Sequence, residues 1–306
     1  MTADQSRPDW IAVDWGTSHL RLWRMSAAGD ILQRIDSDKG MGRLSQQEFE
    51  PVLLDLLAPD LGADRPLTVI CCGMVGSRQG WAEARYRAVP CKPPGLAEAT
   101  VPDADPRLRV FLLPGLSQAS PADVMRGEET QIAGFLFSEP KFDGVLCLPG
   151  THCKWVHISA GEVVSFRTFM TGEMFELLST QSVLRHSVSS SGFDAEAFSE
   201  AVDRTLSHPQ ALAGDLFALR AETLLAGLGA EAARARLSGL LIGAELGGAR
   251  PYWLGRDVVV LGESGVAAAY ARALESQGAA PRTVDPETMT LGGLRAAYAQ
   301  METSAT

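Results

Sequence analysis

Residues 10–18 read WIAVDWGTS, and this stretch decides the fold. The run from Trp10 to Val13 is apolar, which predicts a buried strand, and the strand ends in the carboxylate of Asp14. A Gly-Thr-Ser turn follows at 16–18, where glycine lets the backbone approach an anion and the hydroxyl groups add donors. The stretch therefore predicts a strand that runs directly into a polar loop able to hold an anion.

The same pattern occurs a second time in the chain. In the first half, two predicted strands follow the loop and lead to Lys-Gly-Met-Gly at 39–42. In the second half, an apolar strand at 144–148 runs into Pro-Gly-Thr-His at 149–152, and two more strands lead to Thr-Gly-Glu-Met at 171–174. Coincidence is the alternative, because strand–glycine–hairpin pieces are common. The repeat predicts two similar α/β domains with a boundary near residue 140.

Periodicity and turn residues place the remaining elements. Ser45 and Glu48 form a capping-box pattern that predicts a helix to about residue 58. Ser120-Pro121 predicts the start of another helix, which we expect to continue through Glu129 to about residue 137. The other predicted strands are 19–25, 31–36, 67–71, 109–113, 154–159, 162–169 and 258–261. The other predicted helices are 173–185, 195–206, 212–227, 230–246, 266–276 and 291–301.

Composition limits the class of protein. The chain has 306 residues, enough for about two domains, and 27 Lys and Arg against 37 Asp and Glu give a formal net charge of −10. A general nucleic-acid surface needs a basic face, so we expect no nucleic-acid partner. An anionic ligand stays possible, because backbone N–H groups and a bound metal can hold phosphate locally.

Cysteine usage and hydropathy indicate the compartment. The five cysteines show no zinc-site spacing, and their number is odd, which suits a reducing environment. The first nine residues are polar, without the apolar segment of a signal peptide, and no apolar run approaches the ~18 residues that span a bilayer. We expect a cytoplasmic protein without a membrane partner.

The strand-end carboxylate of Asp14 is the candidate metal ligand. Mg²⁺ prefers carboxylates together with phosphate oxygens, and Asp14 stands beside the first Gly-Thr loop. The alternative is an aspartate that caps its own turn, which is common. Because a second Gly-Thr loop at 150–151 could grip the same polyphosphate, we favour the metal site.

Two adjacent carboxylates, Glu128 and Glu129, are candidates for general-base chemistry. Residues 126–131 read RGEETQ on the predicted mid-chain helix, where neighbouring side chains point about 100° apart, so one of the two reaches a binding site. A carboxylate beside a hydroxyl can accept its proton during phosphoryl transfer. The alternative is a solvated acidic helix start, which the helix dipole favours.

Three further segments could bind small molecules. Residues 73–81, GMVGSRQGW, combine glycine with Arg78, which could pair bidentately with a carboxylate; Lys39 is interpreted in the same way. The alternative for 73–81 is an ordinary strand–helix loop with a surface arginine. Residues 262–265, GESG, follow a buried strand and could seat a nucleotide, but a tight strand–helix turn also needs glycine. The chain contains neither the P-loop pattern nor a Rossmann glycine pattern after the first strand.

Together these motifs resemble the sugar kinase, actin and heat-shock-70 ATPase superfamily. The runs DWGTSHLRLW, CGMVGSRQGW, RGEETQIAG, LPGTHCKWV, FMTGEMF and LGESGVAAAY are similar to those of 2-dehydro-3-deoxygalactonokinases and cover the chain nearly end to end. The resemblance implies an α/β fold of two ribonuclease H-like, actin-like ATPase domains with a nucleotide cleft between them. It implies residues 1–140 and 141–306 as the two domains, and the last helix could pack back on the first.

The resemblance also implies an activity: transfer of the ATP γ-phosphate to the 6-hydroxyl of 2-dehydro-3-deoxy-D-galactonate in galactonate catabolism, with ATP and Mg²⁺ as cofactors. It implies Asp14 near the metal, and leaves both Glu128 and Glu129 as candidate bases. The phosphates and adenosine would lie near Gly16, Thr17, Ser18, Gly150, Thr151, His152, Gly262, Ser264 and Gly265. The sugar acid would lie near Lys39, Gly40, Met41, Gly73, Met74, Ser77, Arg78, Gln79 and Trp81. The second loop has Pro149 where many relatives carry aspartate, so one metal-side carboxylate is evident.

Other readings of the same motifs stay open. A kinase of another sugar or sugar acid would share the fold, because sequence does not fix the stereochemistry at one carbon. A non-catalytic nucleotide-binding sugar sensor would usually carry a DNA-binding helix-turn-helix before the first strand, which here begins near Trp10. Homo-oligomerisation is a possible further property that the sequence does not specify.

Overall fold

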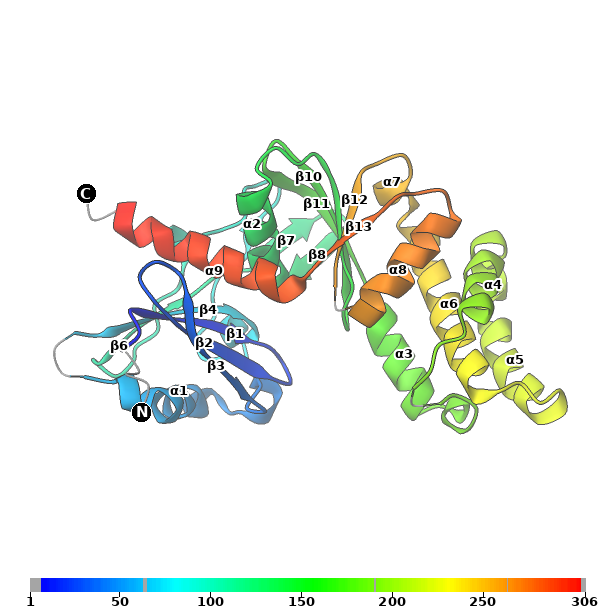
Figure 1. Cartoon of the computed structure of the whole chain (residues 1–306), viewed down its shortest axis with the longest axis horizontal. Coiled ribbons are helices and arrows are strands. Elements are labelled where there is room, and N and C mark those ends of the chain that lie inside the picture. Colours follow the sequence, from blue (N-terminus) through cyan, green and yellow to red (C-terminus); the bar gives the residue numbers. More distant parts are fainter. Residues whose placement is uncertain (1–6, 63–64, 190, 263, 304–306) are drawn as a thin grey trace. The chain divides into compact units, whose positions relative to one another are not determined.

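The computed structural model describes residues 7–62, 65–189, 191–262 and 264–303. The chain forms two compact units, each built around its own five-stranded sheet (Figure 1). The first unit holds the residues up to Phe142, the segment Ala160–Val164 and the residues from Pro286 onward. The second unit holds Asp143–Ser159 and Ser165–Asp285. The chain therefore crosses between the units several times, where the sequence suggested one boundary near residue 140.

The first sheet has the strand order β3-β2-β1-β4-β6. Its strands are β1 (Trp10–Trp15), β2 (Leu20–Met25), β3 (Ile31–Ser37), β4 (Leu67–Gly73) and β6 (Leu108–Leu112). The first three form an antiparallel meander, and β4 and β6 extend the sheet in parallel from β1. The parallel pairing brings the carboxyl ends of β1 and β4 to the same edge, which positions Asp14 beside Cys72.

Both faces of this sheet are covered, as the apolar run of β1 requires. On one face Ile11 and Val13 pack against helix α1 (Phe49–Leu57). On the other face Trp10 and Ala12 pack against helix α9 (Pro286–Thr303), which returns from the C-terminal end of the chain. Successive strand residues point to opposite faces, so every residue of the run is buried.

The second sheet repeats the same strand order, β11-β10-β9-β12-β13. Its strands are β9 (Gly144–Leu148), β10 (Cys153–Ser159), β11 (Glu162–Phe169), β12 (Val258–Leu261) and β13 (Arg282–Val284). Strand β10 is antiparallel to β9, whereas β12 is parallel to both β9 and β13. The internal repeat seen in the sequence is thus a repeat of sheet topology.

The helices of the second unit pack against its sheet and against one another. They are α3 (Thr171–Thr180), α4 (Ala195–Ser207), α5 (Leu212–Leu225), α6 (Ala230–Gly248), α7 (Arg250–Trp253) and α8 (Ser264–Ser276). Phe198 of α4, Leu246 of α6 and Tyr270 of α8 pack in one core with Val145 and Val258 of the sheet. The carboxylate of Glu245 lies inside this core, where Trp155 Nε1 and Tyr270 Oη each donate a hydrogen bond of 2.7 Å.

The helix predicted to start at Ser120-Pro121 is wrong in its first turns. Leu116–Ala119 (β7) and Ala122–Met125 (β8) form a hairpin around this dipeptide, joined by β5 (Arg87–Ala88). Helix α2 (Glu128–Ser138) begins only after Gly127, whose φ of 108° ends the hairpin. Serine-proline is a turn signal as well as a helix-start signal, and here the turn is formed. Most other predicted elements agree with the structure to within a few residues.

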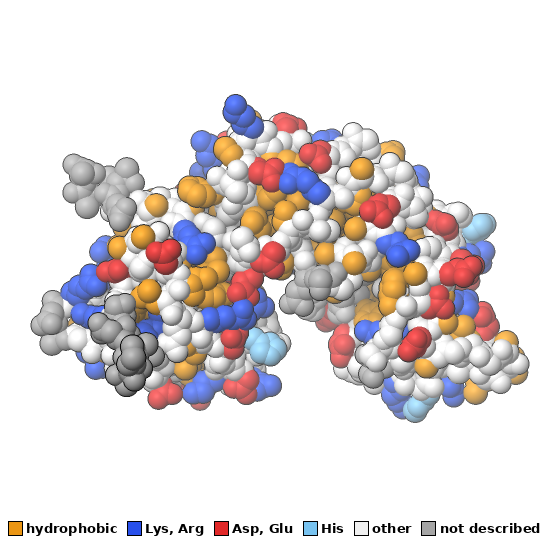
Figure 2. Space-filling model, viewed as in Figure 1, with side chains coloured by type: hydrophobic (Ala, Val, Ile, Leu, Met, Phe, Trp, Pro, Cys, Tyr) orange, Lys and Arg blue, Asp and Glu red, His pale blue; other side chains and the backbone are white. Residues whose placement is uncertain are grey.

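The surface is mixed in charge. On the face that Figure 2 draws, Lys and Arg side chains are interspersed with Asp and Glu side chains. Within the described residues, no helix is both long and apolar enough to cross a membrane.

Candidate active site

Asp14 lies at the carboxyl end of β1 with its side chain 21% exposed. Its cross-strand neighbour on β2 is Arg21, whose Nη1 lies 3.6 Å from Asp14 Oδ2. The Sγ of Cys72 lies 3.9 Å from Oδ1. Burial raises the pKa of Asp14, Arg21 opposes the rise, and the charges of Glu128 and Glu287 add to it. Asp14 thus sits among charged groups from three other segments, β2, α2 and α9, with the Cys72 thiol of β4 beside it.

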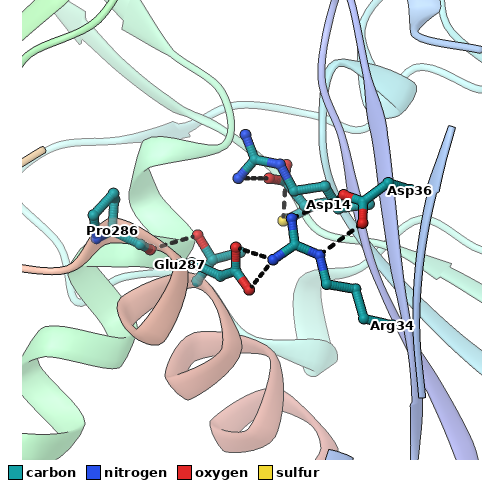
Figure 3. Close-up of polar contacts among 8 residues, drawn as sticks. Asp14, Arg34, Asp36, Pro286 and Glu287 are labelled. Carbon is teal, nitrogen blue, oxygen red and sulfur yellow. Dashed lines mark hydrogen bonds and ion pairs between the residues drawn. The ribbon is translucent and has the colours of Figure 1, made fainter. Parts of the chain in front are cut away.

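An ion-pair network that the sequence did not reveal stands next to Asp14 (Figure 3). Arg34 Nη1 donates to both carboxylate oxygens of Glu287 at 2.7 Å. The same guanidinium donates to Asp36 through Nε and Nη2, each at 2.8 Å. Glu287 lies in the first turn of α9, so the network ties the start of that helix to β3. The separation of 253 residues between Arg34 and Glu287 hides such a pair from any local pattern.

The first Gly-Thr loop is exposed at Thr17 and Ser18 and is supported from behind by the 39–42 loop. The N–H of Met41 donates to the carbonyl of Gly16 at 2.9 Å, and the N–H of Gly42 donates to that of Thr17 at 2.8 Å. A Cβ on Gly40 would stand 2.3 Å from the Ser18 carbonyl carbon. Gly40 and Met41, named from the sequence as sugar-acid residues, therefore support the first loop in this structure.

The second Gly-Thr loop is supported in the same way. The N–H of Glu173 donates to the carbonyl of Thr151 at 2.9 Å, and a Cβ on Gly172 would stand 2.2 Å from the carbonyl oxygen of Gly150. Gly150 and Thr151 are exposed. His152, named from the sequence beside this loop, has its Nε2 2.7 Å from Glu173 Oε2. The two loops thus share a construction as well as a sequence.

Lys154 is a further residue beside the second loop that the sequence did not single out. Its side chain is buried, and its Nζ donates to the carbonyl of His152 at 2.9 Å. A buried cation next to an exposed Gly-Thr turn raises the positive potential there. The one sequence signal was a lysine inside an otherwise apolar strand, which runs against the usual exposure of lysine.

The close packing of Gly172 leads to the first prediction. Gly172→Ala places a methyl group against backbone atoms of Gly150 and Thr151, so one of the two segments must move. If the second loop binds phosphate, we expect KM for ATP to rise about tenfold or more, since a misplacement of about 1 Å can cost 10²-fold in rate. Gly161→Ala, in the turn between β10 and β11, serves as the control for a glycine whose added Cβ meets no described atom within 4 Å, although its φ of 73° adds local strain. Steady-state kinetics with ATP as the varied substrate measure the effect, and an unchanged KM would contradict it.

Glu128 and Glu129 occupy different environments at the start of α2. The carboxylate of Glu129 is buried and accepts the N–H of Gly127 at 2.9 and 2.7 Å. The half-buried Glu128 accepts the N–H of Arg126 through Oε2 at 3.1 Å. Its charge also reaches Asp14, whose pKa it raises. The geometry therefore separates the two candidates: Glu128 lies toward Asp14 and solvent, and Glu129 faces the interior.

Burial raises the pKa of Glu129 from 4.5 to about 8, and the charge of Glu128 adds to the rise. The folded protein therefore keeps a proton on Glu129 that the unfolded chain has already lost above pH 4.5. Its contribution to the free energy of unfolding is fully present below pH 4.5 and is lost as pH rises through about 8.

Glu129→Gln removes this titration while its amide oxygen can still accept the N–H of Gly127. We expect the free energy of unfolding of the variant to fall less than that of the native protein between pH 5 and pH 9. Urea unfolding at several pH values in this range measures the difference. Parallel pH profiles for the two proteins would show that Glu129 is already ionised in the folded state.

Gly73, the first residue of the 73–81 segment, lies between Asp14 and Gly127, the residue before Glu128. A Cβ on Gly73 would stand 3.4 Å from Asp14 Oδ1, and a Cβ on Gly127 would stand 3.4 Å from the Cα of Gly73. Of the sugar-acid candidates here, Trp81 is buried in the core of the first unit. Arg78 is 81% exposed, with its Nε 3.5 Å from Glu83. Of this segment, Gly73 is therefore the residue that lies beside Asp14.

The remaining residues predicted to bind the sugar acid differ in how far they are exposed. Lys39 is 45% exposed, with its Nζ 3.9 Å from Asp55. Gln79 is exposed, Met74 is half-buried, and Ser77 is buried.

The 262–265 segment joins β12 to α8 in the second unit. Gly262 follows the strand, and Ser264 and Gly265 open the helix. Gly265 is exposed, and a Cβ there would meet no atom within 4 Å. Glu263, quoted with this motif, lies outside the described residues. The open N-terminal turn of α8 presents backbone N–H groups of the kind that bind anionic groups.

The donor set at Asp14 fits a magnesium ion held together with a nucleotide. Within the part of the chain that the structure describes, no group of three or more His, Cys, Asp and Glu side chains forms a metal cluster. The contacts of the Asp14 carboxylate with Arg21 and Cys72, at 3.6 and 3.9 Å, are long, which leaves its oxygens able to bind a cation. Mg²⁺ is commonly held by one or two carboxylates, phosphate oxygens and water, so one carboxylate suffices.

Relatives and solved structures match nearly the whole chain. A Rhizobium meliloti protein provisionally named a 2-dehydro-3-deoxygalactonokinase is 41% identical over 94% of this chain and 96% of its own. The Escherichia coli 2-dehydro-3-deoxygalactonokinase is 33% identical over the same shares. A crystal structure of a Sinorhizobium meliloti protein, provisionally assigned the same name, superposes with a TM-score of 0.88 at 40% identity. It covers 95% of this chain and 99% of that chain.

A more distant structure shares the fold alone. The activator of the 2-hydroxyisocaproyl-CoA dehydratase from Clostridium difficile, solved with bound ADPNP, matches with a TM-score of 0.52 at 12% identity. It covers 97% of this chain and 96% of that chain.

Two sheets of the same order, each with a Gly-Thr loop after its first strand, define the actin-like ATPase fold. This confirms the predicted fold class. The family model described as 2-keto-3-deoxy-galactonokinase matches residues 14–297, and the chain belongs to this family. The predicted family is therefore also confirmed.

Proposed function

We propose that this protein phosphorylates 2-dehydro-3-deoxy-D-galactonate at the 6-hydroxyl with ATP, in galactonate catabolism. Family membership supports the substrate and the reaction. The observation that carries the chemistry is the placement of Glu128, whose half-buried carboxylate is close enough to Asp14 to raise its pKa. A carboxylate next to a candidate metal ligand is the arrangement that phosphoryl transfer to a hydroxyl needs.

Glu128 is the proposed general base. As the 6-hydroxyl oxygen attacks the γ-phosphorus, a new O–P bond forms, the bond to ADP breaks, and the hydroxyl proton passes to Glu128. The hydrogen bond from the N–H of Arg126 orients the carboxylate at 3.1 Å. Glu129 acts as a positioning residue, because its buried carboxyl fixes the backbone at Gly127 immediately before the base.

The nucleotide is assigned to the exposed loops. Gly16, Thr17 and Ser18 in the first unit and Gly150, Thr151 and His152 in the second are the proposed phosphate ligands, and Gly262, Ser264 and Gly265 are proposed to contact adenosine. Asp14 would hold Mg²⁺, which supplies positive charge for the phosphates. Arg21 adds a cation beside the same carboxylate. Lys154 stiffens the second loop through the carbonyl of His152.

The domain organisation and the location of the reaction are part of the proposal. We assign the first phosphate loop and the sugar-acid site to the first unit, with α9 as its last element. The second phosphate loop and the adenosine motif belong to the second unit. All five cysteines are free and buried, which is compatible with a reducing cytoplasm.

Purified protein tested with ATP, Mg²⁺ and a panel of sugar acids decides the substrate. We expect ADP release with 2-dehydro-3-deoxy-D-galactonate, and a lower kcat/KM with its C4 epimer, the gluconate-derived acid. A higher kcat/KM for the epimer would move the assignment to another sugar acid of the same class. ADP release with none of the acids would exclude the proposed activity.

A further inference from the structure

The guanidinium of Arg126 is buried beside the proposed active site. The residue is 9% exposed and stands two positions before Glu128. Its Nη2 donates to the carbonyl of Ala84 at 2.7 Å, and its Cζ lies 4.3 Å from the ring centre of Tyr86. A Cβ on Gly76 would stand 3.0 Å from Nη1. The guanidinium therefore lies under the segment that leads from Gly73 to Tyr86.

Two of the three guanidinium nitrogens of Arg126 have no hydrogen-bond partner in the part of the chain that the structure describes. Nε and Nη1 of Arg126 are buried and unsatisfied, and so is the hydroxyl of Ser77, the residue after Gly76. Among the described residues Arg126 forms no ion pair. The neighbouring carboxyl of Glu129 is mostly protonated at neutral pH, because burial raises its pKa to about 8 although the charge of Arg126 opposes the rise. A buried cation without a counter-charge is costly to a folded protein, which indicates that an anion belongs there.

The other cations near the site are less suited to recognise a carboxylate. Arg78 is 81% exposed and Lys39 is 45% exposed, and each already has a carboxylate within 4.0 Å. Exposed ion pairs of this kind contribute little to binding because water screens them. A desolvated guanidinium with free N–H groups binds a carboxylate more strongly and can do so bidentately.

We propose that Arg126 binds the carboxylate of the sugar-acid substrate, with the hydroxyl of Ser77 as a second donor, and so selects acids over neutral sugars. This inference rests on the proposed function. The substrate carboxylate would then bind Arg126, which precedes the proposed base, Glu128, by two residues. A six-carbon acid held by its C1 carboxylate carries its 6-hydroxyl at the opposite end of the molecule, free to reach Glu128.

Tyr86 is the side chain through which the substrate gains access. Its ring lies over the guanidinium and is itself 41% exposed, so it can change rotamer without disturbing the core. Its neighbours Ala84 and Trp81 are buried and hold the rest of the segment in place. Rotation of this one ring uncovers the guanidinium while Ala84 keeps its hydrogen bond to Nη2.

The test compares the acid with its methyl ester, which carries no charge and is larger by one methyl group. We expect the native enzyme to prefer the acid in kcat/KM on the order of 10²-fold, and Arg126→Gln to reduce this preference to a fewfold. The loss should appear mainly as a raised KM for the acid. Arg126→Lys, which keeps the charge but not the fork of donors, should keep part of the preference.

Ser77→Ala separates binding from folding. Among the described residues this hydroxyl has no hydrogen-bond partner, so its removal should leave the melting temperature unchanged or higher, while KM for the acid rises several-fold. An unchanged KM would remove Ser77 from the site. Arg107→Gln, at an exposed arginine paired with Asp105, is the matched control and should behave like the native enzyme.

The results also distinguish this inference from the proposed function. A native enzyme that phosphorylates the acid, with an acid-over-ester preference that survives in folded Arg126→Gln, would overturn the role of Arg126 and leave the kinase assignment intact. Loss of the preference in Arg78→Gln instead would assign the carboxylate to Arg78. A native enzyme inactive with every acid would overturn the proposed function, and calorimetric binding of the acid without ATP would then still test Arg126.

Discussion

Glu128→Gln is expected to lower kcat by about 10²- to 10⁴-fold, the usual contribution of a general base. The amide keeps the size of the side chain and can still accept the N–H of Arg126, but it cannot take the proton of the substrate hydroxyl. KM for ATP should change little, because the proposed phosphate ligands lie on other loops. Steady-state ADP release at saturating substrates measures the effect.

Glu129→Gln is the matched comparison, because it makes the same change one residue further along α2. Its carboxyl is buried and bonded to the N–H of Gly127, so the variant should retain most of the native kcat. If Glu128→Gln turned over at nearly the native rate and Glu129→Gln did not, the base would be Glu129. Equal losses in both variants would indicate that the helix start acts as one unit.

Gly293→Ala is expected to give the largest loss of stability. In α9 this glycine packs against α2 so closely that a Cβ would stand 2.0 Å from the carbonyl oxygen of Thr130. Alanine normally stabilises a helix by up to about 1 kcal/mol relative to glycine. Overpacking against backbone costs about 3 kcal/mol or more, because neither helix has a flexible side chain to move aside. The overpacking cost exceeds the gain in helix propensity, so Gly293→Ala should lower the free energy of unfolding.

We expect the melting temperature of Gly293→Ala to fall by about 5 °C or more. Gly134→Ala should behave similarly, because its Cβ would stand 1.9 Å from the carbonyl oxygen of Met289. Gly214→Ala in α5 is the matched control: its Cβ meets no atom within 4 Å, so helix propensity alone acts and stability should rise. Thermal unfolding of the three variants measures the differences, and a stability gain in Gly293→Ala would contradict the packing.

Kinetics should follow this packing. Helix α2 carries Glu128 at its first position, and α9 carries Glu287 in its first turn. Both carboxylates raise the pKa of Asp14. A shift of α2 away from α9 would therefore change the surroundings of Asp14, and we expect kcat to fall along with stability.

The sequence predicted the parts of this molecule that depend on local patterns. The Gly-Thr loops and the strands before them are contiguous, so apolar runs and turn residues were enough to predict the three-strand start of each sheet and the repeat, although the edge strand β13 was missed. Gly40 and Gly172 each support a Gly-Thr loop, but the sequence showed only that a glycine follows the third strand in both halves. The assignment of Gly40 to the sugar acid followed from that ambiguity, since close backbone approach and ligand binding both favour glycine.

The missing parts depend on contacts between distant segments. Glu287 meets Arg34 across 253 residues, and Gly293 meets Thr130 only because the C-terminal helix returns to the first unit. Arg126 reads in the sequence as one more polar residue before the predicted base. Its burial follows from the fold of the 73–86 segment, which no local periodicity describes.

Identification of the reaction product is the most direct test of the proposed phosphorylation. The protein is incubated with ATP, Mg²⁺ and 2-dehydro-3-deoxy-D-galactonate, and the product is analysed by proton–phosphorus correlation NMR. We expect one phosphate monoester whose phosphorus couples to the two protons on C6, formed in equal amount with ADP. ADP formed without a sugar phosphate, or a phosphate coupled to another carbon of the acid, would contradict it.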